Sequence, residues 1–283
     1  CVDLAALRSG VDCASGAGSA TAARRFDRFP GLSVDVINAD PNGININQRC
    51  GSTHMDALSA MVQAGSYALG IAFDGDADRC LAVDERGGLI DGDQIMAACG
   101  ADLLARGRLA GNAVVATVMS NIGLHAFARE QGLTLECTDV GDRNVLERMV
   151  ERGYVLGGEQ SGHMIFLEHA TTGDGELTAL QILDLLFRSR EPASALFGRC
   201  KRYPQELINV PVPNGQAKQR IMSAPWLDEA VSRWEQRLKG EGRVLVRPSG
   251  TEALVRVMVE AGAEQTAREI AQELANLIKS AEI

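Results

Sequence analysis

Residues 68–79 read ALGIAFDGDADR, a continuous apolar run followed at once by three aspartates at alternate positions and an arginine. An uninterrupted apolar run of strand length is typical of a strand buried on both faces of a parallel sheet. Other short apolar runs alternate with helical patterns as far as residue 187, for example a strand expected at 113–119 and a helix expected at 175–187. The sequence therefore predicts α/β layers.

The C-terminal part of the chain follows a different pattern. A helix is expected at 227–238 and a long amphipathic helix at 264–279, and strands are expected at 208–212, 244–246 and 254–260. This pattern predicts a small α+β domain after the α/β part. Linkers are expected near 90–93 and 202–206. At the other end of the chain the first strand looks cut short, because Val11 is the only apolar residue between Gly10 and Asp12.

Composition excludes several classes of protein. The 283 residues include 28 basic and 37 acidic side chains, a formal charge of −9, which disfavours a nucleic-acid binder. No apolar run approaches the roughly 18 residues that span a bilayer, so no membrane partner is expected. Neither a disulfide framework nor a zinc site is indicated, because the cysteines are scattered and form no C-x-x-C pair. We expect reduced thiols in a cytoplasmic protein at Cys1, Cys13, Cys50, Cys80, Cys99, Cys137 and Cys200.

The three aspartates of the opening stretch are the sharpest chemical feature. Asp74, Asp76 and Asp78 are spaced so that an extended backbone directs all three to one side. Three carboxylates so close repel one another unless a cation or a basic group neutralises them. Hard oxygen ligands in this number favour Mg²⁺ or Ca²⁺, so the segment is a candidate metal loop.

Three other interpretations of this loop stay open at this point. It resembles a solvated acidic turn, and it resembles an EF-hand loop, although Arg79 stands where that motif needs glycine and the flanking segment reads as a strand. The third is a haloacid-dehalogenase-like phosphotransferase, in which the first aspartate after an apolar strand, here Asp74, is the nucleophile.

A second candidate loop lies near the C-terminus, between two expected strands. Residues 247–252 read RPSGTE, and Arg256 follows inside an otherwise apolar strand. Glycine lets backbone N–H groups turn toward a ligand, hydroxyls add donors, and arginine offers a planar fork that matches a phosphate. The alternative is an ordinary turn with a surface arginine.

A third candidate loop, residues 157–163, reads GGEQSGH at the end of an expected strand. Glu159 and Ser161 are suited to bind sugar hydroxyls, and His163 is suited to move protons near neutral pH. Taken alone this signal is weak, because a glycine-rich turn with a hydrogen-bonded histidine is the more common outcome.

Together, and in this order along the chain, the three loops resemble those of the α-D-phosphohexomutase superfamily. Residues 41–47 and 50–54, residues 140–143 and residues 171–175 resemble in particular the branch that acts on glucosamine phosphates. The resemblance covers nearly the whole chain. It implies two mixed α/β-layer domains, 1–92 and 93–203, and a small α+β domain, 204–283, which correspond to the second, third and fourth domains of the family.

The resemblance also implies a reaction and residue roles. Glucosamine 6-phosphate and glucosamine 1-phosphate would be interconverted through a phosphoserine and a bisphosphate, with Mg²⁺ as cofactor, in the supply of UDP-N-acetylglucosamine and cell-wall precursors. Asp74, Asp76 and Asp78 would bind the metal, Arg79 would contact phosphate, and His163 would transfer protons. The residues expected to bind the sugar phosphate are Glu159, Ser161, Arg143, Arg247, Ser249, Gly250, Thr251 and Arg256.

One departure from the family pattern limits these expectations. The family's catalytic serine lies in a Ser-His-Asn-Pro-like segment, and no serine in this sequence is followed by His-Asn-Pro. We therefore expect the chain to begin inside the second domain and to need the family's first domain as a partner for activity. A module that binds Mg²⁺ and sugar phosphate without chemistry is the alternative, and a homo-oligomer is compatible with either.

Overall fold

The computed structural model describes residues 7–281 and divides them into two compact units. The first contains residues 7–120 and 124–201, and the second contains residues 121–123 and 202–281. None of the six cysteines within residues 7–281 forms a disulfide, and Cys1 lies outside the described part. No helix within residues 7–281 combines the length and the apolar character needed to cross a membrane.

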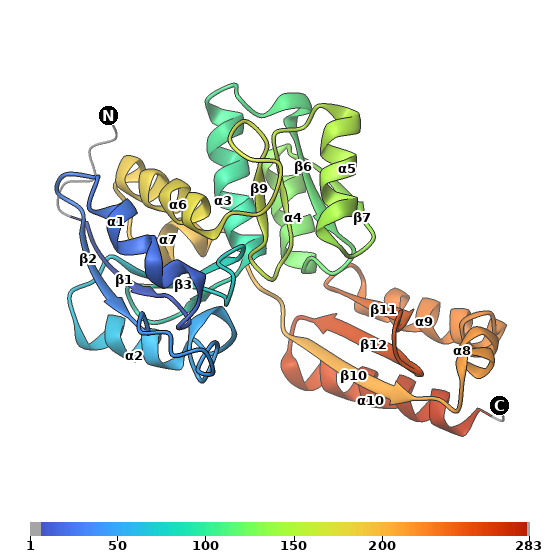
Figure 1. Cartoon of the computed structure of the whole chain (residues 1–283). Coiled ribbons are helices and arrows are strands. Elements are labelled where there is room, and N and C mark those ends of the chain that lie inside the picture. Colours follow the sequence, from blue (N-terminus) through green and yellow to red (C-terminus); the bar gives the residue numbers. More distant parts are fainter. Residues whose placement is uncertain (1–6, 282–283) are drawn as a thin grey trace. The chain divides into compact units, whose positions relative to one another are not determined.

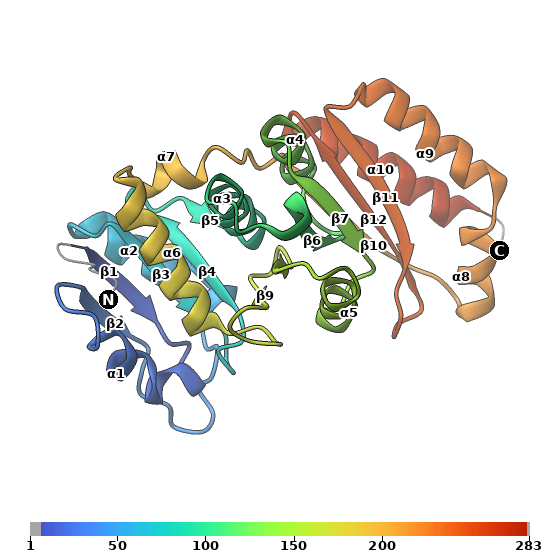
Figure 2. The same cartoon turned by 90° about the horizontal axis from the view of Figure 1, so that it is seen from above.

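The first unit begins with a five-stranded mixed sheet in the order β2-β1-β3-β4-β5. Its members are β1 (Arg8–Asp12), β2 (Ser33–Ile37), β3 (Leu69–Phe73), β4 (Cys80–Asp84) and β5 (Leu89–Ile90). Strand β3 is buried along its whole length, as its apolar run predicts. Its residues alternate between two layers, because Ala72 packs with helix α2 (Asp56–Ala64) while Ile71 and Phe73 belong to the core that contains helix α6 (Gly175–Ser189). Figures 1 and 2 show these two helices on either side of the sheet.

The expectation of a shortened first strand was wrong. Strand β1 has five residues and lies inside the sheet, parallel to both β2 and β3. Its polar and small residues have structural reasons: the buried Ser9 hydroxyl donates to the carbonyl of Leu69 at 3.1 Å, and a Cβ at Gly10 would lie 3.2 Å from the Leu58 side chain of α2. A hydropathy pattern misses this strand because a small residue is needed where the helix packs closely and because the buried serine is polar but hydrogen-bonded.

A second sheet completes the first unit. Its order is β7-β6-β8-β9, with β9 antiparallel to β8. The strands are β6 (Ala113–Thr117), β7 (Thr134–Thr138), β8 (Leu156–Gly158) and β9 (Met164–Phe166). Helix α5 (Asp142–Arg152) packs against one face through Val145 and Met149. Helices α3 (Gly92–Ala105) and α4 (Ile122–Gln131) contribute apolar side chains to the core on the other face.

The two sheets of the first unit share one core. Helix α6 follows the second sheet in sequence but packs on β3 and β4 of the first, and α7 (Ala193–Phe197) joins the same cluster. The segment expected as a linker, residues 90–93, is packed rather than exposed. Ile90 and Asp91 are buried, and Asp91 caps α3 by accepting a hydrogen bond from the Gln94 amide at 3.1 Å.

The second unit is a three-stranded antiparallel sheet in the order β10-β12-β11, covered by helices. The strands are β10 (Gln205–Pro211), β11 (Gly242–Pro248) and β12 (Leu254–Ala261), and the helices are α8 (Gly215–Met222), α9 (Pro225–Leu238) and α10 (Glu264–Ser280). Every second residue of β12 from Val255 to Ala261 belongs to the core shared with the helices. Arg256 and Glu260 therefore lie on the opposite face of the strand. The expected linker at 202–206 coincides with the start of this unit.

Glu260 explains why residues 121–123 belong to the second unit. Its fully buried carboxylate accepts a hydrogen bond from Arg243 at 2.9 Å and another from the backbone amide of Ile122 at 2.8 Å. A buried carboxylate needs such partners, because an unpaired charge in a low dielectric is costly.

Candidate functional site

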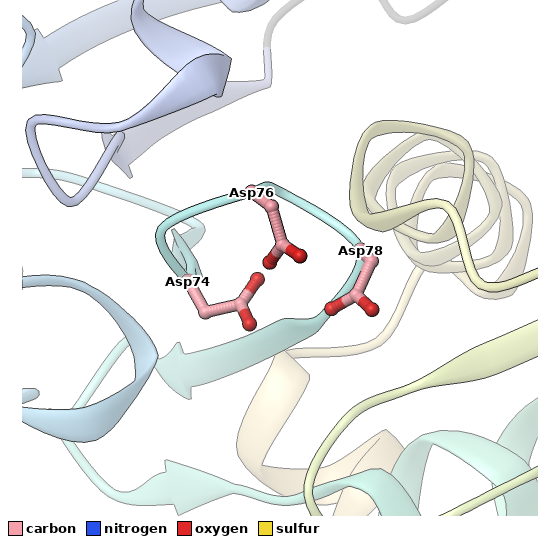
Figure 3. A group of neighbouring side chains, drawn as sticks. All are labelled: Asp74, Asp76 and Asp78. Carbon is pink, nitrogen blue, oxygen red and sulfur yellow. The ribbon is translucent and has the colours of Figure 1, made fainter. Parts of the chain in front are cut away.

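The three aspartates of the acidic loop converge between β3 and β4. One carboxylate oxygen from each of Asp74, Asp76 and Asp78 lies within 4.8 Å of the others, and Figure 3 shows the three side chains turned into the same loop. The grouping agrees with the sequence, but the reason given for it was wrong. The backbone is a turn rather than an extended segment, and Ala77 adopts φ 61° in the left-handed region.

Neighbouring elements hold this turn in place. The amide of Ala17, in the short helical turn after β1, donates to the carbonyl of Gly75 at 2.8 Å. The amide of Gly175, the first residue of α6, donates to the carbonyl of Ala77 at 2.9 Å. The loop is thus fixed from two sides by segments distant in sequence, which keeps the carboxylates close together despite their repulsion.

The charges of the acidic loop fit a divalent cation. Burial raises the pKa of Asp74 to about 6; the Arg79 amide, which donates to its carboxylate at 3.1 Å, opposes this, and the charges of Asp78 and Asp76 add to it. The Arg79 guanidinium lies 3.7 Å from Asp74 and 3.8 Å from Asp78. Three carboxylates beside one guanidinium leave a net charge of about −2 at neutral pH, and their hard oxygen atoms are the ligands that Mg²⁺ prefers.

His163 is buried next to the acidic loop, and both of its ring nitrogens are bonded. Nε2 accepts a hydrogen bond from the amide of Gly173 at 3.0 Å, and Nδ1 lies 3.2 Å from Oδ2 of Asp78. An accepting Nε2 places the ring proton on Nδ1, so this nitrogen donates to Asp78. In this arrangement the ring orients a carboxylate of the triad, and proton transfer by His163 stays a prediction.

The close approach to His163 explains a glycine in the opposing loop. A Cβ at Gly173 would lie 2.5 Å from both Cε1 and Nε2 of the imidazole. No larger residue permits the amide to reach the ring in this geometry. Residues 171–175 are recognisable in the sequence, but the contact that explains Gly173 depends on the fold.

The glycine-rich loop lies beside the acidic loop within the first unit. The amide of Cys80 donates to the carbonyl of Gly162 at 3.0 Å, and Arg79 and His163 form an antiparallel bridge. Glu159 is partly exposed, and its carboxylate accepts from the amide of Gly141 at 3.1 Å and from the Ser161 hydroxyl at 3.3 Å. The structure therefore places the loop that carries Glu159 and Ser161 next to the acidic loop.

Arg143 differs from the other candidates of the first unit. Its side chain is largely exposed and donates to Glu147, one turn further along α5, at 2.7 Å. The nearby Gly141 contributes its backbone amide, which donates to the Glu159 carboxylate. A role for Arg143 in ligand contact stays a prediction.

In the second unit, an arginine at the start of residues 247–252, the basic loop, faces an arginine on the strand that follows the loop. Arg247 on β11 and Arg256 on β12 are directly opposite in the antiparallel register, so both side chains project from the same face. Burial lowers the pKa of Arg247, and the like charge of Arg256 lowers it further. Nε of Arg256 is buried and finds no hydrogen-bond partner among the described residues. Two opposed cations and an unsatisfied donor suit an anion such as phosphate.

The turn between these strands supplies further donors. Ser249 is buried, and its hydroxyl accepts from the Glu252 amide at 3.2 Å. Gly250 has open space around it, and Thr251 is exposed. Lys218 of α8, which the sequence analysis missed, donates to the carbonyl of Ser249 at 2.6 Å and to that of Glu252 at 3.1 Å. No local pattern marks this lysine, because it lies 31 residues before its first partner.

Family models and similar proteins match nearly the whole chain. Family models match residues 3–88 as phosphoglucomutase/phosphomannomutase α/β/α domain II, residues 91–203 as α/β/α domain III, and residues 207–277 as the C-terminal domain. Phosphoglucosamine mutase of Desulforudis audaxviator is 51% identical over 98% of this chain and 60% of its own length. That of Pelotomaculum thermopropionicum is also 51% identical, over 98% of this chain and 62% of its own length. The chain thus spans about 60% of these relatives.

Solved structures support the fold. N-acetylphosphoglucosamine mutase of Aspergillus fumigatus superposes with a TM-score of 0.81 at 22% identity, over 97% of this chain and 61% of the other. A phosphoglucomutase/phosphomannomutase family protein of Burkholderia thailandensis superposes with a TM-score of 0.78 at 21% identity, over the same shares. At this identity the likeness concerns architecture. With the three family models in order along the sequence, it confirms the resemblance that the loops suggested: the chain belongs to the phosphoglucomutase/phosphomannomutase family.

Proposed function

We propose that this chain comprises the metal-binding, sugar-binding and phosphate-anchoring domains of a phosphoglucosamine mutase. The enzyme interconverts glucosamine 6-phosphate and glucosamine 1-phosphate. The observation that carries the proposal is the convergent carboxylate triad beside the glycine-rich loop, in a chain 51% identical to relatives of that name.

In the proposed reaction Asp74, Asp76 and Asp78 hold Mg²⁺. Bound there, Mg²⁺ offsets the negative charge of the phosphoryl group in transfer. Arg79 adds a positive charge at the rim of the same loop, and its side chain is 44% exposed, so a phosphate can reach it. His163 holds Asp78 in its orientation, which keeps the ligand set in place between turnovers.

Glu159 and Ser161 select the sugar in this proposal. The Gly141 amide and the Ser161 hydroxyl already orient the Glu159 carboxylate, so binding a polar group of the sugar costs little side-chain entropy. A carboxylate also favours the charged amino group of glucosamine over a neutral hydroxyl at the same carbon. Arg143 remains a candidate for ligand contact from the neighbouring helix.

The basic loop anchors the phosphate that does not react. Arg247 and Arg256 supply the charge, while Ser249, Gly250 and Thr251 supply hydroxyl and amide donors. Binding a phosphate here relieves the repulsion between the two guanidinium groups and satisfies the buried Nε of Arg256. Glu252, whose carboxylate lies 3.4 Å from Arg256, must give way when the anion binds.

The phosphoryl donor is proposed to come from outside these 283 residues. No serine in the sequence stands in the family's Ser-His-Asn-Pro context, and Mg²⁺-binding carboxylates do not replace a phosphoserine. The proposed enzyme acts in the cytoplasm, consistent with the reduced state of its described cysteines, and supplies UDP-N-acetylglucosamine and cell-wall precursor synthesis.

Titration with Mn²⁺, followed by its electron paramagnetic resonance signal, tests the metal site. We expect Asp76→Asn to weaken binding by at least about tenfold, because it removes one charged ligand of three. Asp27→Asn, an exposed carboxylate on the same unit, is the matched control and should bind as the unmodified chain does. Equal affinities for both variants would overturn the metal assignment.

A coupled assay of glucosamine 1-phosphate formation, with glucosamine 1,6-bisphosphate as activator, tests the reaction. The 283 residues alone should give no turnover, and activity should appear when the serine-bearing domain of a relative is supplied. Turnover by the chain alone would instead favour phosphorylation of Asp74 itself. Sugar-phosphate binding with no activity in either case would favour the non-catalytic binding module.

A further inference from the structure

A lysine of helix α8 holds the backbone of the basic loop in the second unit. Nζ of the half-buried Lys218 donates to the carbonyl of Ser249 at 2.6 Å and to the carbonyl of Glu252 at 3.1 Å. These two carbonyls flank the residues at the tip of the turn. The helix itself is fixed at its start, because the Asn214 side chain caps it by accepting from the Ala217 amide at 2.9 Å.

The two carbonyl contacts decide where the loop's amides point. In a trans peptide the C=O and the following N–H lie on opposite sides of the chain. Since the Ser249 carbonyl faces Lys218, the amide of Gly250 faces away from it. That amide makes no hydrogen bond with any described residue, and the space around Gly250 is open. Lys218 thus turns an unused donor outward.

Charge adds to this geometry. The partners of Lys218 within the described residues are carbonyl oxygens rather than carboxylates, so its positive charge is not cancelled by an ion pair. Arg247 and Arg256 lie on the two strands that the loop joins. A net positive loop with one free amide is the arrangement that stabilises a bound anion.

We propose that Lys218 is a positioning residue for anion binding by the basic loop. It acts through the backbone, by fixing the Ser249 and Glu252 carbonyls so that the Gly250 amide faces the ligand, and it makes no direct ligand contact. This inference rests on the proposed phosphate-anchoring role of the loop and adds a residue to it.

Inorganic phosphate, titrated into the 283-residue protein labelled with ¹⁵N-glycine, provides the test. The Gly250 cross-peak, identified by its loss in Gly250→Ala, should move downfield as phosphate binds. In Lys218→Met the affinity should fall about tenfold, and the downfield shift of Gly250 at saturation should be lost. Lys218→Arg, which can still donate to both carbonyls, should restore the shift and most of the affinity.

The control is Lys279→Met, which removes the same charge from the exposed end of α10. Its affinity should stay within about twofold, since exposed charges at a distance are screened. If Lys218→Met folds poorly, Lys218→Gln gives the same comparison with a polar side chain too short to reach both carbonyls.

Two negative results are distinguishable. If the unmodified protein shows neither phosphate binding nor a Gly250 shift, the phosphate-anchoring role of the loop fails. If it binds phosphate and Lys218→Met keeps the same Gly250 shift at saturation, the loop assignment stands and the positioning role of Lys218 is overturned.

Discussion

His163 and Asp78 are hydrogen-bonded across two loops of the first unit, with Nδ1 of the imidazole 3.2 Å from Oδ2 of the carboxylate. The histidine side chain is 6% exposed and the aspartate side chain 36%. The buried imidazole thus holds one carboxylate oxygen of Asp78, while the Asp78 side chain stays partly exposed to solvent. A partner behind a carboxylate ligand fixes its direction and raises metal affinity.

Replacing His163 by leucine should weaken Mn²⁺ binding by about tenfold, the lower end of the effect of losing a partner behind a metal ligand. The Asp78 carboxylate then gains rotational freedom that binding must remove. His169→Leu, an exposed histidine of the same unit, is the matched control. Identical Mn²⁺ affinities for the two variants would show that the His163–Asp78 contact does not serve the metal.

Gly173→Ala should also weaken Mn²⁺ binding, in this case because of a steric clash. Its Cβ would lie 2.5 Å from two atoms of the His163 ring, so the ring must shift and its contact with Asp78 is disturbed. We expect a loss of about 1–3 kcal/mol in the free energy of unfolding, as for other overpacked sites. Gly262→Ala, where a Cβ meets nothing within 4 Å, should leave stability nearly unchanged in the same urea titration.

The effects of His163→Leu and Gly173→Ala on metal affinity should not be additive, because both substitutions act through the His163 side chain. The double variant His163→Leu with Gly173→Ala should bind Mn²⁺ about as well as His163→Leu alone. Fully additive losses would mean that Gly173 affects the acidic loop by a route that does not pass through His163.

The contribution of Asp74 to the stability of the metal-free protein should fall as pH rises from about 4 to about 6. The pKa of Asp74 is raised from 3.8 to about 6 in the folded chain, so the folded state binds more protons than the unfolded state in this window. Through this group alone, rising pH favours unfolding, and its stabilising contribution is fully present only below the unfolded pKa. Urea titrations in EDTA at several pH values measure the effect.

Asp74→Asn isolates this contribution, since asparagine does not titrate. The difference in unfolding free energy between Asp74→Asn and the unmodified chain should grow in favour of the variant as pH increases through this window. A difference that is constant with pH would refute the raised pKa of Asp74.

Arg247→Ala should weaken phosphate binding by about 1.5–3 kcal/mol, the range for a hydrogen bond to a charged group. Calorimetric titration with glucosamine 6-phosphate measures the loss, and Arg237→Ala, which removes an exposed arginine packed on Trp234 in the same unit, is the control. If Arg247→Ala and the control bind with equal affinity, the loop is an ordinary turn and does not anchor phosphate.

Much of the architecture follows from local patterns. The apolar run that ends at Phe73 predicts a buried strand, and the amphipathic pattern of the last helix predicts one apolar face, because each element is buried according to its own side-chain periodicity. The acidic, glycine-rich and basic loops are likewise visible in the sequence, since each concentrates chemistry in consecutive residues. Their order along the chain was enough to indicate the family.

Other features depend on which backbone segments meet in space. Strand β1 is specified by the close approach of α2 at Gly10, and the joint core of the two sheets by the return of α6 across β3 and β4. Neither leaves a periodic signal, because the residues involved are small or belong to a helix far along the chain.

The site shows the same division. The sequence alone determined which residue types each loop carries, because ligand chemistry resides in the side chains themselves. Only the tertiary structure decided that His163 would orient Asp78 and that Lys218 would hold the turn at Ser249. Hydrogen bonds reach about 3 Å and require aligned donors and acceptors, so they are fixed by the packing of distant segments rather than by residue order.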